Sequence, residues 1–186
     1  AIRRVIHDRG LAVDDAYIVA RYAANLGTGL GFRWNASSPP CEGFTSTMQV
    51  VLLMVAGKLG AGPLGSVAAI GAAAIGGLAT LLCAVARPRS PWFALAAIPA
   101  LAFAASPDTV LHASRGLETA LFAAVSAFTV WLAARAVRCT GTEESGRRRA
   151  GLVAAASAFV CILTGPEGAI VAIACVVTAV VALRRD

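Results

Sequence analysis

Asp14 and Asp15 are adjacent carboxylates in a short polar stretch that lies ahead of mostly apolar sequence. A carboxylate beside a hydroxyl group can accept its proton and so make the oxygen a better nucleophile. On a helix that begins near Asp14 the two side chains point in different directions, so one can face a substrate while the other caps the helix. A purely structural role is the alternative, because aspartate is favoured at the positive N-terminal end of any helix.

Three further polar side chains follow within the same predicted helix. At helical spacing Arg21 and Asn25 share the face of Asp14, while Tyr22 shares the face of Asp15. Arg21 could hold a phosphate or another acidic group, because a guanidinium donates paired hydrogen bonds to such anions. Pairing of Arg21 with one of the aspartates is the equally weighted alternative.

Three glutamates lie at breaks between predicted elements. Glu42 follows a Pro-Pro turn and would either line a binding cleft or be solvated in a loop. Glu118 begins an apolar run, where it could serve only as a favourable charge at a helix N-terminus. Glu167 lies between two apolar runs, and a charge at that depth normally faces a cavity or a partner. Glu167 would contact a substrate or, with Asp15, a divalent ion such as Mg²⁺ or Mn²⁺.

The composition indicates the elements that must position these groups. Hydrophobic residues make up 58% of the chain and charged residues 14%, and the mean hydropathy is +0.75. An ordinary soluble domain of this length could not bury so much apolar surface. The sequence therefore predicts an all-α, polytopic transmembrane helical bundle.

Five apolar runs are predicted to cross the membrane. Residues 63–86 and 117–137 have the roughly 20 residues that a helix needs to span the hydrocarbon layer. Residues 91–106, 150–164 and 168–183 are shorter, so they must tilt little, thin the bilayer or pack against longer helices.

Residues 45–59 are apolar enough to insert, but a crossing there would invert every later span. We interpret this segment as a helix that lies at the outer interface or re-enters against the bundle; a sixth span is the alternative. Residues 1–62 then form an extracytoplasmic region with short interfacial helices, and residues 63–186 form the transmembrane part. Because the chain stops directly after a predicted span, we expect it to be a fragment of a longer protein.

The arginines predict the orientation, because basic residues in short loops stay on the cytoplasmic side. With the spans alternating, three clusters share one side: Arg87 with Arg89; Arg135, Arg138 and Arg147 to Arg149 around a polar loop; and Arg184 with Arg185. The acidic residues then lie on the extracytoplasmic side: Asp14, Asp15, Glu42, Asp108, Glu118 and Glu167. This arrangement accounts for the net charge of +6 without a nucleic-acid partner.

Three motifs occur in order between residues of about 10 and 170: Asp14 to Leu26 with Gly29 to Phe32, Asn35 and Glu42 to Thr45; Arg115-Gly116-Leu117-Glu118-Thr119; and Thr164-Gly165-Pro166-Glu167-Gly168. In these motifs the chain resembles the N-terminal part of polytopic glycosyltransferases of the GT-C fold, which use polyprenyl-phosphate sugars. Within that group it is similar to the branch that includes mycobacterial terminal arabinofuranosyltransferases.

The resemblance implies an enzyme of cell envelope biogenesis, multi-pass in the bacterial plasma membrane, with an extracytoplasmic active site. It would move a sugar from a polyprenyl-phosphate donor to a glycan, lipid or protein acceptor. Asp14 or Asp15 would be the general base, and the substrates would be bound by Arg21, Tyr22, Asn25, Glu42, Arg115, Glu118 and Glu167. Gly165 replaces a family arginine suited to the donor phosphate, and Arg115, where the family has serine, would supply that charge instead.

All of these roles need the aspartates, the Glu118 turn and the Glu167 turn to converge on one outer pocket above the bundle. Two other classes stay open. A secondary transporter would place its acids at mid-membrane within related repeats, and no repeat is evident. A noncatalytic membrane scaffold would tolerate loss of both aspartates.

Overall fold

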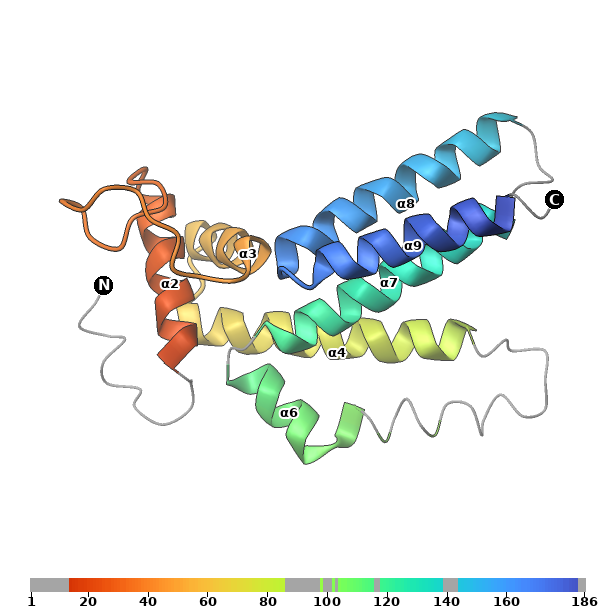
Figure 1. Ribbon diagram of the computed structural model, residues 1–186. Coiled ribbons are helices and arrows are strands. Elements are labelled where there is room, and N and C mark those ends of the chain that lie inside the picture. The colour runs from red at the N-terminus through yellow and green to blue at the C-terminus, as the bar shows by residue number, and fades with distance from the viewer. Residues whose placement is uncertain are drawn as a thin grey trace.

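The computed structural model describes residues 14–85, 104–115, 118–138 and 144–183, with positions 98 and 102 between them (Figure 1). Every regular element in these ranges is a helix, which confirms the all-α prediction for this part of the chain. The helices are α2 (Asp14–Gly27), α3 (Thr47–Lys58), α4 (Pro63–Val85), α6 (Pro107–Ser114), α7 (Thr119–Arg138), α8 (Glu144–Thr164) and α9 (Gly168–Leu183). The expected span 91–106 lies largely outside the described residues.

Helices α4 and α7 occupy the two longest predicted spans, 63–86 and 117–137, to within two residues at each end. Gly65–Val85 within α4 and Thr119–Arg138 in α7 contain 21 and 20 residues and are apolar enough to cross a membrane. Among the described residues these are the two helices that meet both requirements.

Helix α9 coincides with the predicted run 168–183, whereas α8 begins at Glu144. The helix that contains the predicted run 150–164 therefore begins before residue 150, and Arg147 to Arg149 lie in this helix instead of in a loop. Glu144 is favourable in a first helical turn and arginine is a good helix former, so the polar sequence extends the helix beyond its apolar run.

Helix α6 was not predicted, although its start has clear local signals. Pro107 occupies an early position at which its missing N–H costs nothing, and Asp108 lies in the first turn. Asp108 thus belongs to a short helix that packs on α4, not to an irregular loop.

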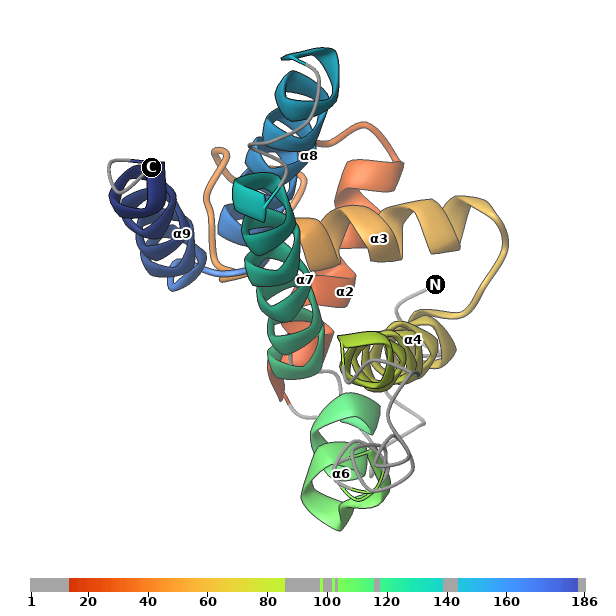
Figure 2. The same ribbon diagram turned by 90° about the vertical axis from the view of Figure 1, so that its right-hand side faces the viewer.

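The helices lie in two directions (Figures 1 and 2). Helices α4, α7, α8 and α9 run broadly along one axis, and α7 contacts the other three. Helices α2 and α3 lie across one end; Figure 2 shows α3 from the side where α4 and α9 are seen nearly end-on. We call residues 14–58 the transverse cap, residues 28–46 within it the cap loop, and α7, α8 and α9 the bundle.

The transverse cap shares an apolar core with the start of α4. The buried members come from α2, α3 and the start of α4: Val19, Tyr22, Ala23, Val50, Leu53 and Val67. Ser46 caps α3 by accepting a 3.2 Å hydrogen bond from the Gln49 N–H. With 12 residues α3 is about 18 Å long, too short to cross a layer of about 30 Å, so nothing supports the alternative of a sixth span. Its location at the outer interface stays a prediction.

Gly29 explains where α2 ends. Its φ is +83°, a left-handed conformation that most residues avoid. The Gly29 N–H donates to the Leu26 carbonyl over 3.1 Å, and the Leu30 N–H donates to the Asn25 carbonyl over 3.0 Å. This Schellman motif stops the helix and turns the chain into the cap loop.

The bundle exposes large apolar side chains. The most exposed on α8 and α9 are Leu152, Phe159, Ile170, Ile173 and Val176, each more than 60% accessible. An apolar surface of this extent is rare on a monomer in water and marks contact with lipid or with other protein.

Candidate functional site

Glu118 and Thr45 bring two of the sequence motifs together. Thr45 ends the cap loop, and its hydroxyl donates a hydrogen bond to the Glu118 carboxylate. Glu118 is half-buried directly before α7. The contact joins positions 73 residues apart and fixes the transverse cap against the bundle.

Glu167 lies in the tight turn between α8 and α9, at the same end of the bundle as Glu118. A Cβ atom built on Gly165 would lie 3.0 Å from the Glu167 carboxylate and 3.6 Å from the Phe122 ring. Phe122 is one turn into α7, and its N–H donates to the Glu118 carbonyl over 2.8 Å. The Glu167 side chain therefore folds back over Gly165 toward the start of α7.

The same turn depends on Gly168. A Cβ atom there would lie 2.1 Å from the Cys161 carbonyl oxygen, which no side chain tolerates. The buried Thr164 hydroxyl donates to that same carbonyl over 2.7 Å. The glycine lets α9 begin in contact with the last turn of α8, which places Glu167 at the surface.

Asp14 and Asp15 occupy the first turn of α2, as predicted, and both side chains are exposed. Helix α2 belongs to the end of the molecule that also holds the start of α7 and the α8–α9 turn (Figure 1). A first-turn position suits both a proton acceptor and a favourable charge at the helix end, so both interpretations stay open.

Arg21 and Asn25 hold the cap loop. Arg21 donates from Nε to the Trp34 carbonyl over 2.7 Å and from Nη2 to the Asn35 side chain over 2.9 Å, and its guanidinium lies 5.0 Å from the centre of the Trp34 ring. Asn25 donates to the Arg33 carbonyl over 2.6 Å. Arg21 and Asn25 lie on one face of α2, as predicted. The hydrogen bonds of their side chains go to the cap loop and not to the N-terminal aspartates.

Tyr22 is a core residue, which corrects its expected role in substrate binding. It is 2% exposed, its hydroxyl lies 3.4 Å from the Cys41 sulfur, and its ring packs edge-on against Phe44 with centroids 4.9 Å apart. The hydrogen bond to Cys41, together with burial, raises the pKa of Tyr22 above the usual value for tyrosine. Tyr22 follows the buried Val19 by three residues, and this helical spacing is the sequence signal that places Tyr22 on the apolar face of α2.

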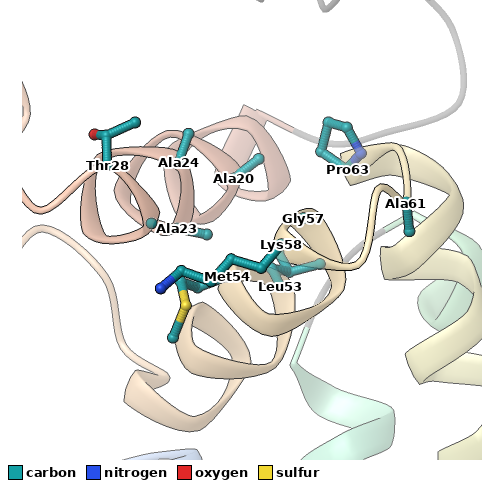
Figure 3. A pocket seen from close by; sticks show the side chains of 11 residues that line it. Ala20, Ala23, Ala24, Thr28, Leu53, Met54, Gly57, Lys58, Ala61 and Pro63 are labelled. Carbon is teal, nitrogen blue, oxygen red and sulfur yellow. The ribbon is translucent and has the colours of Figure 1, made fainter.

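The cap also contains a groove of about 280 Å³ between α2 and α3 (Figure 3). Ala20, Ala23 and Ala24 of α2 line it together with Leu53, Met54 and Lys58 of α3, and Ala23 points toward α3. This groove was not predicted; its local signal in the sequence is the pair Ala20 and Ala24, small side chains four residues apart on one face of α2.

A second hollow lies on the cap loop and is lined by Phe32, Pro40, Cys41 and Glu42. The expected pocket shared by the acidic turns is neither of these two hollows, because none of Asp14, Asp15, Glu118 and Glu167 lines them. Of the acidic residues predicted for the site, only Glu42 lines one of these two hollows.

Two further expectations concern charge. Within the residues that the structure describes, no three His, Cys, Asp or Glu side chains lie close enough together to hold a metal ion, so a metal site on Asp15 and Glu167 has no structural support.

Arg115 is exposed at the end of α6, three residues before Glu118, and its backbone N–H donates to the Leu111 carbonyl over 3.0 Å.

Comparison with known proteins finds no relative of this chain. No family model, no curated protein and no solved structure matches the chain.

Proposed function

We propose that the chain forms part of a membrane glycosyltransferase that moves a sugar from a polyprenyl-phosphate donor to an extracytoplasmic glycan, lipid or protein acceptor. The contact between Thr45 and Glu118 carries this proposal, because it joins the acidic N-terminal motif to the second motif at one end of the bundle. The Glu167 turn lies at the same end, beside Phe122.

A bacterial plasma membrane is the proposed location. Two helices are long and apolar enough to cross it, and α9 exposes isoleucine and valine side chains that suit lipid. The direction of α7 separates Glu118 at its start from Arg135 and Arg138 in its last turn. Because arginines stay on the cytoplasmic side, the multi-pass orientation that we propose has the carboxylates outside.

The proposed reaction uses an aspartate as general base. Asp14 or Asp15 accepts the proton of the acceptor hydroxyl. At the same time, the oxygen of that hydroxyl forms a bond to the anomeric carbon of the donor sugar. The bond from that carbon to the phosphate oxygen breaks, and the electron pair leaves with the polyprenyl phosphate. Arg115 would stabilise the departing phosphate, and Glu118 and Glu167 would accept hydrogen bonds from sugar hydroxyls.

This proposal is tested by measuring the rate of sugar transfer with the protein in proteoliposomes. Radiolabelled pentose and hexose polyprenyl phosphates serve as donors. The double substitution of Asp14→Asn and Asp15→Asn should lower the rate at least about 100-fold, the usual contribution of a general base. Asp108→Asn is the matched control, because Asp108 is also an exposed first-turn acid, on α6. Undiminished transfer by the double variant, or ion-coupled flux of a solute in vesicles that show no transfer, would defeat the assignment.

A further inference from the structure

The hollow on the cap loop is built from two segments that the backbone ties together. The Cys41 N–H donates to the Phe32 carbonyl over 2.9 Å. This hydrogen bond fixes the distance between the two segments that line the hollow, one with Phe32 and the other with Pro40, Cys41 and Glu42. The hollow measures about 330 Å³ and lies open to solvent.

Phe32 is 36% exposed, and its ring also packs against other aromatic side chains of the cap. Its centroid lies 5.3 Å from that of Phe44, and Phe44 packs in turn against the buried Tyr22. An aromatic face fixed in this way binds the apolar face of a ligand without first losing rotamer freedom.

Glu42 adds one polar group to this aromatic wall. Its exposed carboxylate offers acceptors only, so it suits a ligand that donates hydroxyl hydrogen bonds. The like charge of Glu42 disfavours a phosphate in the hollow relative to a neutral ligand. A neutral sugar has both required features, an apolar ring face and several hydroxyl donors.

The position of the hollow relates it to the Glu118 turn. Glu42 precedes Thr45 by three residues, so their Cα atoms lie no more than about 11 Å apart. The Thr45 hydroxyl is bonded to Glu118. The hollow and the residue that contacts Glu118 therefore belong to the same short stretch of the cap loop.

We infer that Phe32 and Glu42 form a binding subsite for a neutral sugar unit of an acceptor glycan. This inference rests on the proposed function and names a glycan as the acceptor class. The subsite is separate from the aspartates, since neither of them lines the hollow.

Direct binding tests the subsite independently of catalysis. The chain in nanodiscs is titrated with neutral pentofuranose and hexopyranose trisaccharides, and binding is followed by calorimetry. Phe32→Ala and Glu42→Gln should each raise the Kd about tenfold, the effect of losing one aromatic or charge-assisted contact. Leu30→Ala is the control, because Leu30 is similarly exposed at 39% on the same loop but does not line the hollow.

Glu42→Gln guards against loss of folding, because it keeps the side-chain shape at an exposed position. Trisaccharide affinities unchanged in both variants, no trisaccharide binding at all, or preferential binding of tetramethylammonium would overturn the subsite. Binding that depends on Phe32 and Glu42 in a chain without transferase activity would support the subsite and defeat the proposed enzyme. In an active chain both substitutions should raise the acceptor KM and leave the donor KM unchanged.

Discussion

The transverse cap and the bundle bury opposite kinds of side chain. In the cap Val50 and Leu53 are buried, while the polar loop lies outside and is held by Arg21. In the bundle Thr129 and Thr164 are fully buried, whereas Ile170 and Ile173 are 69% and 63% exposed. The cap thus has the distribution of a protein in water, and the bundle has the distribution expected of helices in lipid.

Polar contacts between helices explain the interior of the bundle. Thr129 donates to the Ser157 carbonyl of α8 over 3.1 Å, and the Ser126 hydroxyl lies 3.4 Å from the Cys161 sulfur. Contacts of this kind, with close packing, hold membrane helices together where no hydrophobic driving force acts between them. The comparison indicates that the two regions are stabilised by different forces, and four experiments test that difference.

The largest effect is expected at Gly168. Gly168→Ala forces a methyl group against the Cys161 carbonyl, so α9 must move away from α8, at a cost of about 3 kcal/mol. Thermal unfolding in detergent measures it. Gly151→Ala on α8 is the control, since a Cβ there meets nothing within 4 Å, and it should unfold at or slightly above the temperature of the unmodified chain. Equal melting temperatures for the two variants would contradict the packing of this turn.

The next effect separates the surroundings of the two regions. Ile173→Asp on α9 should hinder membrane insertion by about 2.5 kcal/mol, whereas Leu59→Asp should be nearly neutral, because Leu59, the residue that directly follows the cap, is 82% exposed. Glycosylation-mapped insertion in microsomes measures both. Equal insertion of the two variants would remove the distinction between a lipid-facing bundle and a water-facing cap.

A smaller effect is expected where the two regions meet. Thr45→Val removes the hydroxyl that donates to Glu118, which should cost about 1 kcal/mol and loosen the packing of the cap against the bundle. Hydrogen exchange of the α3 amides should quicken, and Thr45→Ser should restore protection. Unchanged exchange in Thr45→Val would show that this hydrogen bond does not couple the regions.

The smallest effect concerns pH. The pKa of Tyr22 is raised in the folded cap, so the folded state holds this proton more tightly than the unfolded chain does. Its contribution to stability is complete below pH 10 and is lost as the pH rises through the folded pKa. Urea unfolding of the cap between pH 9 and about 11 should show this decline, and Cys41→Ala should lessen it. A decline of equal slope after Tyr22→Phe would assign it to another group.

Several elements were predictable because their signals are local. The aspartates at the start of α2, the length of the apolar runs in α4 and α7, and the common face of Arg21 and Asn25 depend on residues within a few turns of one another. The early start of α8 was missed because the prediction followed hydropathy alone, although its polar first turns are good helix formers.

The sequence by itself therefore determined the class of the fold and the faces of its helices, since periodicity and end signals act over short distances. Only the tertiary structure decided that Tyr22 is core, that Arg21 holds the cap loop, and that Thr45 meets Glu118 across 73 residues. The side-chain pattern of one helix specifies which face is apolar or charged. Which partner that face meets depends on how the whole chain packs.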